Sequence, residues 1–181
     1  MNKIIDITGV AIKTERLYLR PFEEGDLADF YEYARVDGVG QMAGWQPHES
    51  IEKSREILNR FIAEKKTFAI VYNNKVIGSL GIERYNEKHI PQFDSLQGRE
   101  IGYVLSKDYW GQGIMPEAVR GVIDWLFSKV KLDFITVAHF EWNNQSKRVI
   151  EKCGFSYLKD IDYETRLGTV ERSRLYVMSK E

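Results

Sequence analysis

The chain has 181 residues, of which 43% are apolar and 29% charged, so we expect one globular domain over residues 1–181. Twenty-six basic and 27 acidic residues give a net charge of −1, which argues against direct nucleic-acid binding. No apolar run approaches the roughly 20 residues that cross a bilayer, and no signal-peptide core opens the chain. Cys153 is the only cysteine and the three histidines share no ligand spacing, which predicts a cytoplasmic protein without disulfide, metal site or membrane contact.

The first half of the chain alternates short strands and helices. Residues 16–20 alternate polar and apolar side chains up to Pro21 and predict a strand. Asp26 and Ser50 are capping residue types, and apolar side chains recur after each at helical spacing. Two strands are predicted at residues 67–72 and 76–84, joined through a pair of asparagines that tolerate a tight turn.

The second half continues with strands and two more helices. Residues 86–98 suggest a long exposed excursion, followed by a strand at 99–105 and an amphipathic helix at 116–130 with Pro116 in its first position. A strand at 134–139, a helix at 146–153 and strands at 155–161 and 170–178 complete the chain. The order predicts an α+β protein, with helices flanking one mixed, mostly antiparallel sheet of about seven strands.

One loop has the composition of a phosphate-binding site. The predicted strand ending at Leu105 leads into a loop that contains Gly111 and Gly113, and a helix follows at once. Free N–H groups at a helix start attract anions, and glycines allow a close approach to the backbone. The loop lacks the lysine of a Walker motif and the third glycine of a dinucleotide motif, and a plain strand-to-helix turn would also explain it.

A second motif lies about thirty residues downstream. Asn143 is suited to cap a helix, and Gly154 is suited to end it in the left-handed conformation. Together the glycine loop and residues 143–155 resemble the GNAT superfamily of acyl-CoA-dependent N-acetyltransferases. Residues 14–21, 99–105 and the Trp-Gly-x-Gly loop are similar to the RimJ/RimL-type branch of ribosomal-protein N-terminal acetyltransferases, and the resemblance covers about residues 12–178.

This resemblance implies the GNAT fold, a three-layer arrangement with about four helices, and a cofactor site for acetyl-CoA without a metal. The backbone of the strand before the loop would bind the acetyl and pantetheine arm, as would the Asn143 side chain, and the loop would bind the pyrophosphate. Trp110 and Met115 depart from the broad family pattern at the two ends of the loop. The implied cofactor-binding residues are Tyr103, Val104, Leu105, Trp110, Gly111, Gln112, Gly113, Ile114, Met115, Asn143 and Ser146.

The resemblance also implies direct transfer of an acetyl group to a primary amine in a ternary complex, which calls for a base and an acid. Many relatives carry a tyrosine acid where this chain has Ile150, so Ser146 is the candidate acid, unless it only caps its helix. Glu164 and Glu100 are the candidate bases, and either would otherwise be a surface carboxylate. An α-amino group with a pKa near 8 would arrive partly neutral and need no base.

The acceptor is a small-molecule or peptide amine in this interpretation. Trp45 and Tyr72 are candidate lining residues of its pocket, and His139 is a candidate for orienting it, although all three would also serve as core residues. A homodimer is compatible with the branch. The alternative function is a noncatalytic acyl-CoA-binding or regulatory module of the same fold. A phosphoryl-transfer enzyme is disfavoured because the chain lacks a Walker lysine and a magnesium carboxylate pair.

Overall fold

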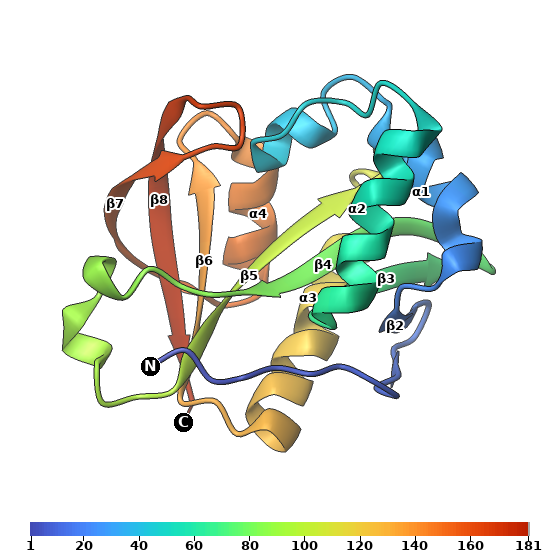
Figure 1. Cartoon of the computed structure of the whole chain (residues 1–181). Coiled ribbons are helices and arrows are strands. Elements are labelled where there is room, and N and C mark those ends of the chain that lie inside the picture. Colours follow the sequence, from blue (N-terminus) through green and yellow to red (C-terminus); the bar gives the residue numbers. More distant parts are fainter. Residues whose placement is uncertain (181) are drawn as a thin grey trace.

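The computed structural model describes residues 1–180, which form an eight-stranded sheet with helices on both faces (Figure 1). In chain order the elements are β1 (Ile12–Lys13), β2 (Tyr18–Pro21), α1 (Leu27–Ala34), α2 (Ile51–Glu64), β3 (Thr67–Tyr72), β4 (Lys75–Glu83), β5 (Gly98–Leu105), α3 (Ile114–Trp125), β6 (Phe134–Phe140), α4 (Asn144–Lys152), β7 (Ser156–Glu164) and β8 (Val170–Ser179). The strands lie in the order β1-β2-β3-β4-β5-β6-β8-β7. The predicted α+β class is confirmed, and the strand beyond the expected seven is the two-residue β1.

Local sequence signals explain several element ends. Ser50 caps α2, and its hydroxyl accepts a hydrogen bond from the Lys53 N–H at 3.2 Å. Asn73 and Asn74 have φ values of 48° and 62°, the left-handed pair that closes the two-residue turn between β3 and β4. Both predictions from the sequence are therefore confirmed at the level of backbone geometry.

The start of α3 differs from the prediction by two residues. The helix begins at Ile114, so Pro116 is its third residue and not its first. A proline is tolerated there because the N–H groups of the first turn have no partner within the helix in any case. Beyond Trp125 the helix widens into a π-helical turn, Leu126–Val130, and ends at Lys131 with a φ of 62°.

The segment between β4 and β5 is largely exposed, as expected, but it is anchored at Ile90. Two short turns, Glu87–His89 and Pro91–Phe93, flank Ile90, which is buried. Ile90 belongs to a small apolar cluster with Tyr85 and Phe134, and the Phe93 ring lies 4.7 Å from that of Phe134. The sequence signal was weak because one apolar residue among polar neighbours has no periodicity.

Two apolar layers hold the helices against the sheet. On one face, Phe68 and Ile70 of β3 pack in the large core that α3 covers. On the other, Ala69 of β3 packs with apolar residues of α1 and α2. No helix within residues 1–180 is both long and apolar enough to cross a membrane. The alternation along β3 thus assigns one face of the sheet to α1 and α2 and the opposite face to α3.

Candidate functional site

The strands β5 and β6 form the one parallel pair of the sheet, and they separate after three residue pairs. Gly98, Arg99 and Glu100 pair with Phe134, Ile135 and Thr136, and beyond Glu100 the ladder ends. Figure 1 shows the two strands diverging from this point. Residues 102–105 pair with β4 on one side only, so their backbone N–H and C=O groups on the side of β6 are available to a ligand.

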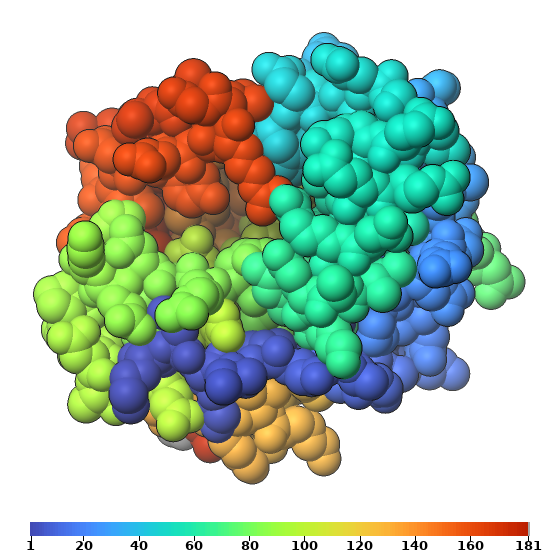
Figure 2. Space-filling view, in the orientation of Figure 1, coloured from blue at the N-terminus to red at the C-terminus, as the bar shows by residue number. Residues whose placement is uncertain are grey.

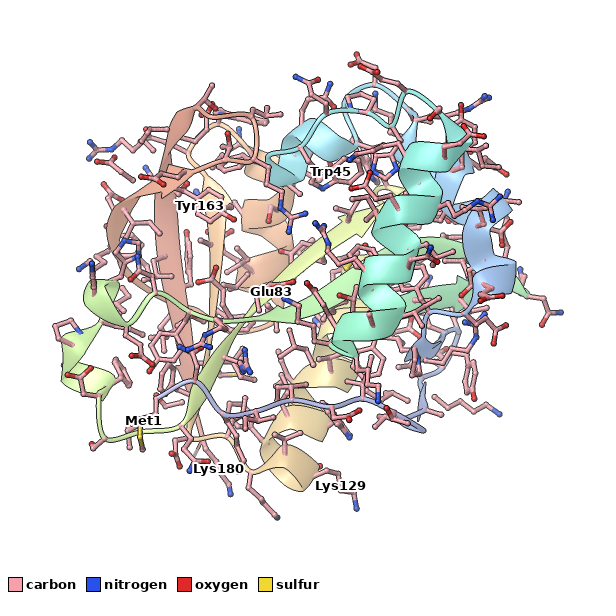
Figure 3. All side chains as sticks on the ribbon, viewed as in Figure 1. Met1, Trp45, Glu83, Lys129, Tyr163 and Lys180 are labelled. Atoms are coloured by element: carbon pink, nitrogen blue, oxygen red, sulfur yellow. The ribbon has the colours of Figure 1, made fainter. Side chains whose placement is uncertain are left out.

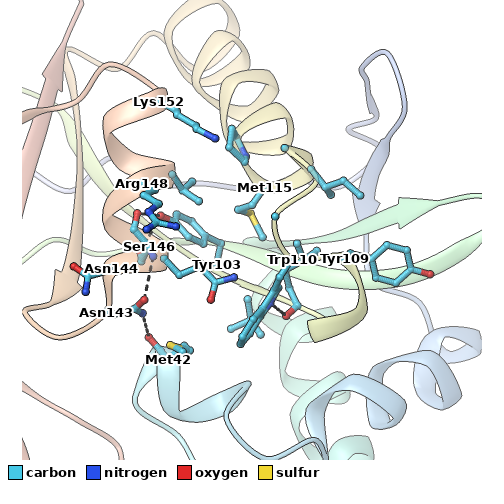
Figure 4. Close-up of a pocket in the computed structure, with 18 of the residues that line it drawn as sticks. Met42, Tyr103, Tyr109, Trp110, Met115, Asn143, Asn144, Ser146, Arg148 and Lys152 are labelled. Atoms are coloured by element: carbon cyan, nitrogen blue, oxygen red, sulfur yellow. Dashed lines mark hydrogen bonds between the residues drawn. The ribbon is translucent and has the colours of Figure 1, made fainter.

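A cavity of about 440 Å³, which we call the wedge cavity, lies beside the separated strands (Figure 4). It is lined by the end of β5, the loop before α3 and one side of α4. The lining residues are Val39, Met42, Tyr103, Val104, Leu105, Tyr109, Trp110, Gly111, Gly113, Ile114, Met115, Pro116, Asn143, Asn144, Gln145, Ser146, Arg148, Val149 and Lys152. Of the eleven cofactor-binding residues predicted from sequence, all except Gln112 line this one cavity.

The loop of the wedge cavity has the backbone geometry of an anion site. Gly111 and Gly113 have φ values of 75° and 74°, a region that side chains disfavour, and no atom lies within 4 Å of an added Cβ at Gly111. Gly113 precedes α3 directly, so the unpaired N–H groups of the first helical turn stand at this loop. The loop can therefore bind a phosphate group through its backbone.

Two side chains, one at the start of the loop and one from the N-terminal segment, fix the shape of the loop. The Trp110 indole donates a hydrogen bond to the Leu105 carbonyl at 2.8 Å and lies beside the loop. Arg16 of the N-terminal segment donates to the Gln112 carbonyl at 3.0 Å and forms an ion pair with Glu117 at 2.7 Å. Gln112 thus contributes its backbone to the structure of the loop, while its side chain donates to the Asp108 carbonyl at 2.9 Å.

Asn143 caps α4, as the sequence predicts, and also holds a second segment. Its Oδ1 accepts from the Ser146 N–H at 3.0 Å, and its Nδ2 donates to the Met42 carbonyl at 3.2 Å. Met42 lies in the short Gly40–Ala43 turn between α1 and α2. The buried Asn143 side chain therefore joins α4 to this turn, and a contact with pantetheine would share an amide that already has two partners.

Tyr103 of β5 and Ser146 of α4 form a hydroxyl pair. The Tyr103 Oη lies 3.0 Å from the Ser146 Oγ, and burial raises the pKa of the Tyr103 hydroxyl far above neutrality. The tyrosine therefore stays protonated and can donate a hydrogen bond. Sequence reasoning assigned Tyr103 only a backbone role, because the pairing depends on two segments 43 residues apart.

A smaller cavity of about 100 Å³, the inner cavity, adjoins the wedge cavity. It shares Met42, Tyr103 and Ser146 with the wedge cavity and adds Ala43, Glu100, Ile101, Gly102, Ala138, His139, Phe140 and Tyr163. Glu100 and Gly102 point to the face that α1 and α2 cover, whereas Tyr103 points to the opposite face. Because β6 diverges from β5 beyond Glu100, side chains from both faces of the sheet line the same inner cavity.

Glu100 is the titratable group of the inner cavity that would change charge near neutral pH. Burial, together with a smaller effect of Glu83 on the neighbouring strand, raises the pKa of its carboxyl to about 7. The Thr136 hydroxyl donates to it at 3.3 Å, which opposes the rise. A carboxylate with such a pKa is suited to accept a proton at neutral pH. The same carboxylate, together with burial, raises the pKa of the Tyr163 hydroxyl.

The other candidates from sequence lie apart from this group. Glu164 is exposed at the end of β7 and lines neither the wedge cavity nor the inner cavity. Tyr72 packs edge-on against Tyr109, with ring centres 5.9 Å apart, and lines neither cavity. Trp45 lines a third cavity beside α2. His139 lines the inner cavity but is buried, and its Nδ1 lies 2.7 Å from the Phe140 carbonyl.

Several residues that line the wedge and inner cavities were not predicted from the sequence. Lys152 lies one helical turn after Arg148, so both cations reach the wedge cavity, whereas Lys147 pairs with Glu151 at 3.8 Å. The spacing of four residues was a signal that could have identified Lys152. Tyr109, Met42 and Tyr163 carried no local signal, because tertiary packing alone brings them to the cavities. Within residues 1–180, no group of three or more His, Cys, Asp or Glu side chains could hold a metal ion.

Comparison with known proteins identifies the family. The family model described as "Acetyltransferase (GNAT) domain" matches residues 16–156. The chain is 48% identical over 159 residues to "Probable N-acetyltransferase YjcK" of Bacillus subtilis, covering 80% of this chain and 82% of that protein. It shares the fold of a GNAT-family acetyltransferase from Bacillus anthracis (TM-score 0.80, 24% identity, 94% and 98% of the two chains). The same holds for Mycobacterium smegmatis RimJ in complex with CoA-disulfide (TM-score 0.74, 19% identity, 93% and 87%). The chain belongs to the GNAT family and is an acyltransferase enzyme.

Proposed function

We propose that this enzyme transfers an acetyl group from acetyl-CoA to a primary amine by direct attack within a ternary complex. The observation that carries the proposal is that the wedge and inner cavities adjoin at Tyr103 and Ser146. One cavity has the features of a cofactor site, and the other holds a carboxylate with a pKa near neutrality. A thioester in one cavity and an amine in the other would meet at this junction.

The wedge cavity supplies groups that match each part of acetyl-CoA. The N–H groups around Gly111 and Gly113 suit the pyrophosphate, and the unpaired backbone edge of β5 suits the amides of the pantetheine arm. Arg148 and Lys152, both exposed on α4, would face a further phosphate. The bound acetyl-CoA supplies the reactive thioester, and the remaining chemistry falls to side chains at the junction.

Glu100 is the proposed base. An amine that enters the inner cavity as an ammonium ion must lose a proton before its nitrogen can attack the thioester carbon. The Glu100 carboxylate would accept that proton, and its pKa of about 7 keeps a large fraction ionised at neutral pH. Glu164 has less support for this role because it is exposed and lies outside both cavities.

Tyr103 and Ser146 are the proposed proton donors to the leaving sulfur. When the carbon–sulfur bond breaks, the sulfur leaves as a thiolate and takes up one proton. The Tyr103 hydroxyl would give this proton, directly or through the Ser146 hydroxyl 3.0 Å away, and would regain one from the attacking nitrogen, which releases its second proton as the amide forms. In this assignment the acid lies on the strand β5, whereas many relatives carry it on the helix, at the position that is Ile150 in this chain.

The first test is the melting temperature with excess acetyl-CoA, compared with ATP and NADH. A ligand at a hundred times its Kd stabilises by about 2.7 kcal/mol, a shift of roughly 5–10 °C at this size. We expect a shift with acetyl-CoA alone, followed by release of free CoA when a primary amine is added. The absence of a shift, or a shift without CoA release from any primary amine, would contradict the proposal.

A further inference from the structure

A third cavity, the front cavity, opens on the face of the molecule between α2 and the turn that joins β7 to β8. Its volume is about 700 Å³. Figure 2 shows this face hollowed between these two parts, and Figure 3 labels Trp45 in the upper part of the same view. The floor reaches Ser79 of β4, and Phe30, Ile57 and Phe61 form an apolar wall.

The front cavity adjoins the inner cavity across a thin partition. Met42 and Ala43 line the inner cavity, and Trp45, two residues after Ala43, lines the front cavity. The Cα atoms of residues two apart lie no more than about 7 Å from one another. A second segment also passes from one cavity to the other, because Tyr163 lines the inner cavity and Arg166 lines the front cavity. The two segments are joined by a hydrogen bond from the Arg166 N–H to the Gly44 carbonyl at 3.1 Å.

Lys53, Arg60 and Arg166 are the cations that line the front cavity, and Lys53 pairs with Glu56. Arg60 is half-buried on α2, and Arg166 is exposed on the β7–β8 turn. Within residues 1–180 neither arginine forms an ion pair, in contrast to Arg16 and Arg172. The Arg60 Nη2 is buried without a hydrogen-bond partner. A guanidinium group presents a planar set of donors that fits a carboxylate, so an unpaired arginine in a cavity favours such a ligand.

The carboxylates around the front cavity lie at its rim, and Lys53 and, more weakly, Arg60 lower the pKa of the Glu56 carboxyl. Glu49, Glu52 and Glu56 are exposed at the rim, where water and salt screen them, and Glu56 pairs with Lys53 at 2.9 Å. His48 is buried, and burial lowers its pKa to about 4, so it is neutral at pH 7. Arg60 and Arg166 therefore remain the groups that can recognise an anion deep in the cavity and at its mouth.

We infer that the front cavity recognises the acceptor, and that the acceptor is an amine carrying a carboxylate, as in a peptide with an acidic residue close to its free N-terminus. The carboxylate binds Arg60 and Arg166, while the amine reaches Glu100 through the adjoining inner cavity. The apolar wall and Trp45 contact the part of the acceptor between these two groups. This inference rests on the proposed acetyl transfer and adds the substrate class.

The experiment compares two short peptides that start with a free alanine and carry either glutamate or glutamine at positions 2 and 3. Release of CoA is measured with acetyl-CoA and increasing peptide. We expect a KM about tenfold lower for the glutamate peptide, because a hydrogen bond to a charged group contributes that much or more. The variants R60Q and R166Q should raise the KM of the glutamate peptide by a similar factor and leave its kcat unchanged.

Matched variants keep the result interpretable. Arg55 is exposed on α2 and outside the front cavity, so R55Q should leave the preference for glutamate intact. R166Q changes an exposed turn residue and preserves the test even where R60Q folds poorly. Equal KM values for the two peptides in the unaltered enzyme, with turnover present, would overturn the inference and leave acetyl transfer standing. A failure of the proposed function differs from this, because no amine would then release CoA.

Discussion

The wedge cavity and the front cavity lie in the same molecule but are built from different kinds of groups. Most of the wedge cavity comes from three short stretches, residues 103–105, 109–116 and 143–152, and its loop can offer backbone N–H groups around Gly111 and Gly113. Most of the front cavity comes from one stretch, residues 45–61, to which Phe30, Ser79, Arg166 and Leu167 are added from other parts of the chain. Its charged groups are side chains, so a substitution there changes the ligand, whereas backbone N–H groups tolerate changes of side chain.

This difference explains two departures of the loop from the broad family pattern. Trp110 directs its indole N–H to the Leu105 carbonyl and leaves the N–H groups of the loop available. Met115 is buried in the core beneath the start of α3. Neither side chain replaces a backbone donor, so the geometry at Gly111 and Gly113 is retained.

The largest expected effect concerns the carboxylate of the inner cavity. E100Q removes the proposed base, and kcat/KM should fall by about 10²–10³-fold at pH 7.5. In the unaltered enzyme kcat/KM should rise with pH through about 7 as the Glu100 carboxyl ionises, and this limb should vanish in the variant. The measurement is CoA release between pH 5.5 and 9.

E164Q is the matched control for E100Q, because it makes the same chemical change at an exposed carboxylate. We expect its kcat/KM to stay within about twofold of the unaltered enzyme, the usual range for a surface substitution. The assignment of the two glutamates would have to be exchanged if E164Q lost the pH-dependent limb and E100Q kept it.

A smaller loss is expected at the junction of the cavities. Y103F and S146A should each lower kcat by about 10–100-fold, since a positioned proton donor contributes on this order, while acetyl-CoA affinity changes little. The double variant should lose less than the product of the single losses, because the two hydroxyls act as a pair. Losses that multiply would show that the hydroxyls act independently and would remove the relay from the mechanism.

The separation in sequence of the residues that form a feature determines whether that feature could be predicted from the sequence. The loop before α3 and the cap of α4 were predicted because their glycines, Asn143 and the helix periodicity lie within one stretch of chain. The Tyr103–Ser146 pair and the bond from Asn143 to Met42 were not, because each joins elements that only the tertiary fold brings together. Glu100 was found as one of two candidates, and its burial distinguishes it from Glu164.

A moderate effect is expected when the backbone of the wedge cavity is strained. Alanine at Gly113 must adopt a φ of 74°, at a cost of about 1–2 kcal/mol, or shift the loop away from its anion-binding geometry. We expect G113A to weaken acetyl-CoA binding by about tenfold, measured by calorimetry. G9A is the control, since Gly9 has a φ of 70° in open space away from the cavities. Equal acetyl-CoA affinity in G113A and G9A would argue against a pyrophosphate site at this loop.

The last expected effect is on stability and separates burial of Glu100 from its chemistry. The folded-state pKa of about 7 lies above the ordinary value of 4.5, so the folded protein is penalised as pH rises from 4.5 to 7. E100Q has no such penalty. It should be more stable than the unaltered enzyme by about 3 kcal/mol at pH 8, a rise in melting temperature of roughly 6–12 °C, and should differ little at pH 4.5. A variant that melts lower at both pH values would instead show that the bond from Thr136 outweighs the desolvation of the carboxylate. A rise in stability together with the loss of turnover would identify Glu100 as a carboxylate kept in an unfavourable environment for its reaction.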